Sequence, residues 1–252
     1  MGRIGIMAAL HDEIAVLLGA MGQQAHAERV GLRDYYVGEL EGRECVIVLA
    51  RVGKVAAAAT AVTLVREFKA EALVFTGLAG AVAQSVRIGD VIVADSLVQH
   101  DLDASPLFPR HEVPLLGRSH FDADTALSAL IRRCASDYLA ADFFTDIGPA
   151  ARAAFGLDQP RVHSGLIASG DRFINDGPVA QTLLASLPSV LCVEMEGAAV
   201  AQVCHEHGIP FAVVRTISDR ADAAASGDFS AFLTQVARFY SSGILRRLLG
   251  SM

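Results

Sequence analysis

Short apolar runs alternate with amphipathic stretches along almost the whole chain. Six apolar runs are predicted to be strands: Arg3–Ala9, Ala72–Thr76, Gly89–Val98, Gly165–Ser169, Val190–Val193 and Phe211–Ile217. Nearly unbroken apolar runs of this length suit strands covered on both faces of a sheet. Six further stretches are predicted to be helices: His11–Met21, Lys54–Phe68, Ala123–Tyr138, Val179–Leu187, Glu196–His207 and Phe229–Leu249. Asp34–Leu40 and Glu44–Ala50 are predicted to pair as a hairpin that turns at Glu41–Gly42.

This alternation predicts an α/β protein with a central mixed, largely parallel twisted sheet flanked by helices. No linker-like composition divides the chain, so residues 1–252 are predicted to form a single domain. Residues 103–118 contain three prolines and are predicted to be a loop. Residues 139–161 are the least regular segment and are interpreted as an insertion.

Composition narrows the class of protein. Of the 252 residues, 52% are hydrophobic and 19% are charged, which excludes a disordered chain. The same apolar excess predicts a full core and is compatible with a surface buried against a second subunit. The formal net charge of −7 offers no attraction to the phosphates of nucleic acid.

Three features predict a cytoplasmic protein without a membrane partner. The apolar N-terminal stretch carries Asp12 and Glu13, and signal peptides do not place acids inside their hydrophobic region. No apolar run reaches the roughly 18 residues that a membrane-spanning helix needs. The four cysteines form neither a CxxC pair nor a zinc-binding spacing, so they are predicted to be buried free thiols.

Small or polar residues stand where four of the predicted strands end. These junctions are Ala8–Glu13, Thr76–Gly80, Val193–Gly197 and Val213–Arg220. Because ligands of open α/β sheets bind at the carboxyl ends of strands, the four junctions are interpreted as one site. Ala79 and Gly80 would let the backbone approach a ligand closely. Glu194 and Glu196 lie two residues apart, so both can face the same site if that segment is extended.

Each junction also has a purely structural interpretation. The acids after the first strand can stabilise the first turn of a helix, and those near Glu196 or Asp219 can cap one. The glycines of Thr76–Gly80 can serve a tight packing turn, because neither a GxGxxG pattern nor the lysine of a P-loop is present. The residues alone leave these alternatives open.

Taken together, the junctions resemble a known family. The stretches MAALHDE, RVGKVAAA, TGLAGA, IGDVIVAD, SGDRFI, VEMEGAAVAQVC and VVRTISDRAD are similar to those of 5'-methylthioadenosine/S-adenosylhomocysteine nucleosidases, members of the nucleoside phosphorylase superfamily. The resemblance covers nearly the whole chain in order, apart from residues 103–118 and 139–161. It implies a nucleoside phosphorylase-like fold and hydrolysis of the N-glycosidic bond of 5'-substituted adenine nucleosides, with no metal or other cofactor.

The resemblance also implies roles for individual residues. Asp219 would protonate adenine N7 with help from Ser218, and Glu13 would take a proton from the attacking water, which Arg215 would help to position. The resemblance places the following residues around the substrate: Glu196 at the ribose hydroxyls, Met195 beside the sugar, Phe173 stacked on adenine, Ile174 at the edge of adenine, and Val52 at the 5' substituent. The family's dimer predicts that Phe108 of one subunit closes the 5' pocket of the other.

Two positions depart from the family pattern. Leu78 stands where the nucleosidases usually have a small hydroxyl residue, so the water would depend more on Glu13 and Arg215. Arg51 stands where a small residue is usual. If its guanidinium faced the pocket, it would suit an anionic 5' substituent; if it faced solvent, it would have no such role.

Three alternative functions stay open from the sequence. The first is hydrolysis of futalosine or another 5'-modified nucleoside. The second is a phosphorylase, which is disfavoured because the acids of His11–Glu13 would repel phosphate. The third is a nucleoside-binding protein without activity, against which the joint presence of Glu13, Glu196, Arg215 and Asp219 argues.

Overall fold

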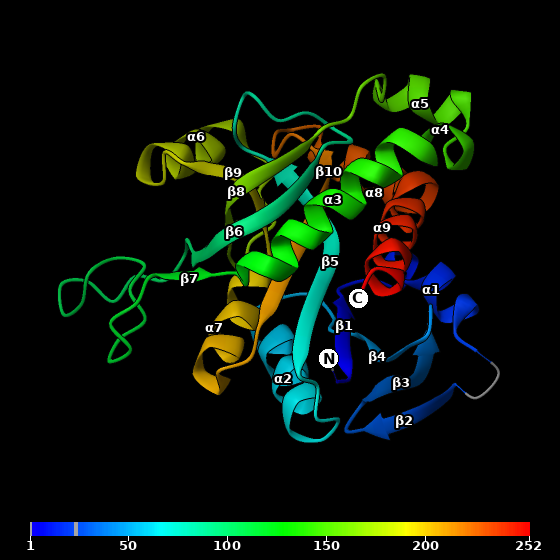
Figure 1. Ribbon diagram of the computed structural model, residues 1–252. Helices are drawn as coiled ribbons and strands as arrows, with labels where there is room; N and C mark the ends of the chain where they lie inside the picture. The colour runs from blue at the N-terminus through cyan, green and yellow to red at the C-terminus, as the bar shows by residue number, and fades with distance from the viewer. Residues whose placement is uncertain (1, 23–24) are drawn as a thin grey trace.

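In the part of the chain that the structure describes, ten strands form one mixed sheet, which the helices cover on both faces (Figure 1). The computed structural model describes residues 2–22 and 25–252. The strands are β1 (Ile4–Ala8), β2 (His26–Val30), β3 (Arg33–Leu40), β4 (Arg43–Leu49), β5 (Ala72–Ala81), β6 (Val91–Gln99), β7 (His120–Asp122), β8 (Val162–Ser169), β9 (Val190–Glu194) and β10 (Phe211–Asp219).

The sheet closes on itself around five of its strands. Its order is β10-β6-β8-β9-β5-β1-β4-β3-β2, and β10 pairs again with β5. Gly80 of β5 lies opposite Asp219 of β10 on one side and Val193 of β9 on the other. The prediction of a mixed sheet is confirmed, although antiparallel pairings are as numerous as parallel ones, with five of each. The closure brings the carboxyl ends of β5, β9 and β10 together.

Two helical layers bury opposite faces of the sheet. The helices are α1 (Ala15–Ala20), α2 (Lys54–Arg66), α3 (Thr125–Ala141), α4 (Phe143–Asp146), α5 (Pro149–Phe155), α6 (Gly177–Ser186), α7 (Gly197–His207), α8 (Ala225–Phe232) and α9 (Arg238–Gly250). Ile4 and Ile6 of β1 pack into the core that α3 and α9 cover, whereas Met7 packs toward α2 and α7. This alternation is the period of two expected of a strand covered on both faces.

The predicted helix His11–Met21 is divided. A single 3-10 turn, η1 (His11–Glu13), comes first, and α1 begins only at Ala15 because Ile14 has non-helical backbone angles. The buried side chain of Glu13 accepts a hydrogen bond from the Leu10 N–H at 2.8 Å, which folds the turn back on itself. Sequence spacing alone could not show this break, because the apolar stripe continues across it.

The structure differs from the predicted elements at four other places. The strand after Ala72 does not end at Thr76 but runs on to Ala81, so Gly77–Gly80 is strand and not turn. Strand β2 was not predicted, because its residues are largely exposed and polar. The closing helix is interrupted by a π-helical turn, η2 (Leu233–Ala237). Residues 120–122 at the end of the proline-rich segment form β7.

The two irregular segments lie at different places in the molecule. Residues 139–161 contain the end of α3 together with α4 and α5, and Phe143 packs edge to face on Tyr240 of α9. Residues 103–118 form an extended loop that projects from the body of the molecule near β7 (Figure 1). The four cysteines are buried and free, as predicted. Within residues 2–22 and 25–252, no helix combines the length and apolarity required to span a membrane.

Candidate active site

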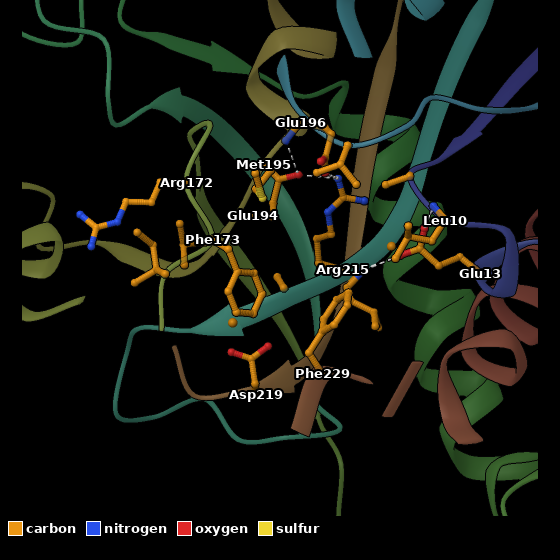
Figure 2. A pocket seen from close by; sticks show the side chains of 18 residues that line it. Leu10, Glu13, Arg172, Phe173, Glu194, Met195, Glu196, Arg215, Asp219 and Phe229 are labelled. Atoms are coloured by element: carbon orange, nitrogen blue, oxygen red, sulfur yellow. Dashed lines mark hydrogen bonds and ion pairs between the residues drawn. The ribbon is translucent and has the colours of Figure 1, made fainter. Parts of the chain in front are cut away.

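A cavity of about 400 Å³ opens where β1, β5, β8, β9 and β10 end (Figure 2). Its lining comprises Ala9, Leu10, Glu13, Val52, Gly77, Leu78, Ala79, Gly80, Arg172, Phe173, Ile174, Val193, Glu194, Met195, Glu196, Arg215, Asp219 and Phe229. These residues come from segments that are far apart in the sequence. The expectation that the strand ends form one site therefore agrees with the geometry.

Ten of the twelve site residues expected from the sequence line this cavity. They are Glu13, Val52, Ala79, Gly80, Phe173, Ile174, Met195, Glu196, Arg215 and Asp219. Ser218 lies behind the wall, where its Oγ donates to Asp219 Oδ2 at 2.8 Å. Phe108 lies in the 103–118 loop and does not line this cavity.

Glu13 brings a carboxyl group into the cavity from the turn after β1. Its Oε2 accepts from the Leu10 N–H at 2.8 Å, and its Oε1 accepts from the Leu78 N–H of β5 at 3.1 Å. Burial raises the pKa of this carboxyl group, while the two N–H groups and Arg215 act in the opposite direction. A carboxyl group whose pKa is raised toward neutrality is suited to accept a proton.

Asp219 lies at the last position of β10, on the far side of the cavity from Glu13 (Figure 2). Its Oδ1 accepts from the Ala221 N–H at 2.9 Å. Burial raises its pKa, and the charges of Asp228 and Asp222 add to the effect, although the hydrogen bonds from Ala221 and Ser218 lower it. A carboxyl group in this environment can hold a proton and donate it to a ligand.

Two further carboxyl groups share one guanidinium between Glu13 and Asp219. Arg215 Nη2 lies 2.5 Å from Glu194 Oε2 and 3.8 Å from Glu196 Oε2, and all three side chains are buried. Glu196 Oε1 also accepts from the Gly53 N–H at 2.9 Å. Burial, followed by the charge of Glu194, raises the pKa of Glu196 to about 8. Burial opposes the charge on Arg215, but Glu194 and Glu196 outweigh it and raise its pKa.

Apolar side chains make up another part of the cavity lining. Phe173 follows β8 and is 39% exposed toward the opening. Its ring meets that of Phe229 from α8 edge to face, with centroids 5.8 Å apart. Leu10 and Val52 extend this apolar wall toward the β4–α2 turn. Such a wall suits a planar ring and an apolar substituent.

The two unusual residues have clear positions. The side chain of Leu78 lines the cavity, and its backbone N–H is bonded to Glu13. Arg51 is exposed, and its Nη2 donates to the carbonyl oxygen of Leu32 at 2.7 Å. Arg51 does not line the cavity, so the second of its two interpretations holds.

Several lining residues had no role assigned from the sequence, among them Leu10, Glu194 and Phe229. Leu10 and Phe229 belong to apolar patterns that gave no reason to place them at a site. Glu194 was singled out together with Glu196 but was given no function. The structure separates the two, because Glu194 caps α7 through the N–H groups of Glu196 and Gly197. The capping interpretation is therefore correct for Glu194.

Comparison with known proteins identifies similar chains. The model of the phosphorylase superfamily matches residues 3–249. A 5'-methylthioadenosine/S-adenosylhomocysteine nucleosidase from Actinobacillus succinogenes is 34% identical over 237 residues, which are 94% of each chain.

Solved structures agree with this result. The nucleosidase of the same name from Neisseria meningitidis, in complex with methylthio-immucillin-A, is 30% identical with a TM-score of 0.87 over all of both chains. Futalosine hydrolase of Helicobacter pylori is 28% identical with a TM-score of 0.85, covering 100% of this chain and 98% of that one.

Proposed function

This chain belongs to the phosphorylase superfamily, and we propose that it hydrolyses the N-glycosidic bond of 5'-substituted adenine nucleosides such as 5'-methylthioadenosine and S-adenosylhomocysteine. The products are adenine and the corresponding thioribose. The observation that carries this function is the convergence of Glu13, Glu196 and Asp219 around one cavity of about 400 Å³.

Asp219 serves the leaving group. Breaking the glycosidic bond moves electrons into the purine, so a proton delivered to N7 lets adenine leave as a neutral molecule. The raised pKa of Asp219 favours the protonated carboxyl group that this step requires. Ser218 and the Ala221 N–H fix the orientation of the carboxyl group.

Glu196 and Glu13 serve the sugar and the water. Positive charge develops on the ribose as the bond breaks, and the carboxylate of Glu196 stabilises it while it binds the hydroxyl groups. Glu13 takes a proton from the attacking water, which Arg215 helps to position on the opposite side of the sugar from the base. Met195 packs beside the ribose.

The remaining lining residues hold the base and the 5' substituent. Phe173 stacks on adenine, while the backbone of Ile174 contacts the edge of the ring. Ala79 and Gly80 lack large side chains and let β5 pass close to the purine. Val52 contacts the 5' substituent together with Leu10 and Phe229.

The site is better suited to bind water than phosphate as the attacking nucleophile. A phosphate ion requires several donors directed at one place, and the place expected for the nucleophile holds the carboxyl group of Glu13. The second candidate substrate is futalosine, because a futalosine hydrolase is among the similar structures. Its 5' substituent carries a carboxylate. The apolar side chains of Leu10, Val52 and Phe229 favour the methylthio group of 5'-methylthioadenosine over any charged 5' substituent, including the amino-acid end of S-adenosylhomocysteine.

A base-release assay across nucleosides tests this function. We expect turnover of 5'-methylthioadenosine or S-adenosylhomocysteine that is unchanged when phosphate is omitted, and slower turnover of futalosine. Arg51→Ala should leave the order of substrates unchanged, since Arg51 faces away from the cavity. If base is released only in the presence of phosphate, the chain is a phosphorylase. If the parent protein prefers futalosine, the proposed substrate class is wrong.

We also propose that the protein acts as a homodimer in which the 103–118 loop of each subunit closes the site of the other. Leu107 and Leu115 of this loop are 83% and 93% exposed. On the other side of the proposed contact, Val52 at the cavity and Val55 of α2 are exposed as well. Apolar side chains gathered near a cavity are typical of a protein interface.

The variant Phe108→Ala tests the crossed loop. We expect kcat/KM for nucleosides with long 5' substituents to fall about 5- to 30-fold, as loss of 1–2 kcal/mol of contact energy predicts. After subunit exchange with Glu13→Gln, activity should rise above that of Phe108→Ala alone. The mixed dimer then contains one site with an intact Glu13 and an intact loop. A monomer by sedimentation, or no gain on mixing, would contradict the proposal.

A further inference from the structure

The carboxylate of Glu194 is surrounded by protein donors. Its Oε1 accepts from Ser169 Oγ, and both of its oxygens accept from the Gly197 N–H at 2.9 Å. Oε2 also accepts from the Glu196 N–H at 3.1 Å and from Arg215 Nη2 at 2.5 Å. The side chain is 2% exposed. With its oxygens occupied in this way, Glu194 is poorly placed to bind a substrate hydroxyl group and instead organises the protein around it.

Arg215 is held from two directions. Glu194 binds Nη2, and the guanidinium lies over the ring of Phe75, with the central carbon 4.1 Å from the ring centroid. Among the described residues, Nε and Nη1 of Arg215 are buried and have no hydrogen-bond partner. A buried donor without a partner is costly, so a ligand or water is expected to bind it.

The free nitrogen Nη1 and the carboxyl group of Glu13 approach the same place over β5. A Cβ atom built on Gly77 would lie 2.7 Å from Arg215 Nη1 and 3.0 Å from Glu13 Oε1. Gly77 therefore has no space for a side chain, and both groups reach the cavity lining at the same point of β5. One water molecule bridging the two groups from the cavity side can accept from Arg215 while it donates to Glu13.

We propose that Glu194 is a positioning residue that holds Arg215 so that Nη1 and Glu13 Oε1 share the attacking water. This inference rests on the proposed hydrolytic function. Without Glu194, the guanidinium has two other carboxyl groups within reach, those of Glu196 and Glu13. If Arg215 paired with Glu196, it would occupy the carboxylate that binds the ribose hydroxyl groups. If it paired with Glu13, it would weaken the general base that takes the proton from water. Glu194 prevents both because it is the partner nearest to Nη2.

Glu194 also influences the protonation of Glu196. The groups that act on Glu196 are Glu194 and Glu13, which raise its pKa together with burial, and Arg215 and the Gly53 N–H, which lower it. Removing the charge of Glu194 should therefore bring the pKa of Glu196 down from about 8. Because Glu196 acts as a carboxylate, the acidic limb of the rate profile should then move to lower pH.

The variant Glu194→Gln tests the inference by steady-state kinetics across pH. We expect kcat to fall about 10²-fold, as for other losses of reactive geometry, while KM changes by only a few-fold. The acidic limb should move to lower pH. Asp90→Asn is the matched control, since Asp90 is a buried carboxylate that binds the Arg161 N–H and His163 away from the cavity. It should lower Tm without changing kcat or the profile.

Parent turnover tests the proposed function, and the ratio of variant to parent tests the inference. If Glu194→Gln retains kcat within about 3-fold and only loses stability, Glu194 is a structural cap and the proposal is wrong. Should that variant not fold, Ser169→Ala removes one donor but keeps the charge of Glu194. It should then lower kcat only a few-fold and leave the acidic limb in place. A moved limb in Ser169→Ala would contradict the assigned role.

Discussion

Asp219→Asn is expected to slow the release of adenine by about 10²–10⁴-fold, the usual contribution of general acid catalysis. Asparagine keeps the shape of the side chain and can still accept the hydrogen bond from the Ala221 N–H. It cannot transfer a proton to N7, so adenine would have to leave as an anion. Single-turnover measurement of base release, with the enzyme in saturating excess over the substrate, reports this step directly.

Two further measurements separate proton donation from simple loss of charge. Asp222→Asn removes an equal charge from a neighbouring carboxyl group that does not line the cavity, and it should leave most of the activity intact. A 5'-substituted riboside with a leaving group that needs no proton should be cleaved by Asp219→Asn nearly as well as by the parent. If Asp219→Asn released adenine at a rate within about 10-fold of the parent, Asp219 would not be the general acid.

The pH profile provides a third test of the same residue. Burial and the charges of Asp222 and Asp228 raise the pKa of Asp219, so its proton persists to higher pH than in an exposed aspartate. Parent activity should decline as pH rises through that raised pKa, because the proton donor is then lost. Asp219→Asn has no proton to lose at this position. Its basic limb should be absent.

The positions of most strands and of the site could be predicted because both follow from simple rules. Buried strands appear in the sequence as apolar runs. The hairpin turn predicted at Glu41–Gly42 is present in the structure, where both residues adopt the positive φ angles of a tight hairpin turn. The rule that ligands bind at strand ends then grouped Glu13, Glu196 and Asp219 in one site without any coordinates. Phe173 was expected there only from the resemblance to the nucleosidase family.

The end of β5 was predicted incorrectly because small residues occur both in tight turns and in strands that neighbouring side chains approach closely. The strand was predicted to end at Thr76, yet β10 pairs with β5 as far as Gly80, and β9 pairs with it from there to Ala81. The absence of a side chain at Gly77 is required by Arg215, which approaches from β10, and by Glu13, which approaches from the turn after β1. Such a reason exists only in three dimensions, so local sequence cannot supply it.

The different duties of Glu194 and Glu196 were also hidden from the sequence. A period of two places both acids on one face of an extended segment. The backbone leaves the extended conformation at Glu196, with φ −139° and ψ −40°, and this bend directs the two carboxyl groups to different partners. Phe229 reaches the cavity only because α8 folds back from β10, a tertiary contact without a local pattern.

Glu13→Gln is expected to lower kcat by about 10²–10⁴-fold, because glutamine cannot take the proton of the attacking water. The carboxyl group now accepts one N–H on each oxygen, from Leu10 and from Leu78. Glutamine has only one acceptor oxygen, so its NH₂ group would face one of these donors and turn the side chain. Leu78 provides no hydroxyl group to hold the water in its place.

Two controls distinguish a lost activation of water in Glu13→Gln from general damage to the site. Adenine should bind this variant as it binds the parent in calorimetry, since Phe173 and Asp219, the residues proposed to hold the base, lie away from Glu13 (Figure 2). Asp12→Asn changes the exposed neighbour of Glu13 and should retain parent kinetics. Turnover of Glu13→Gln at the parent rate would contradict this role. Glu196, which has a raised pKa and lies 3.8 Å from Arg215 Nη2, would then be the candidate base.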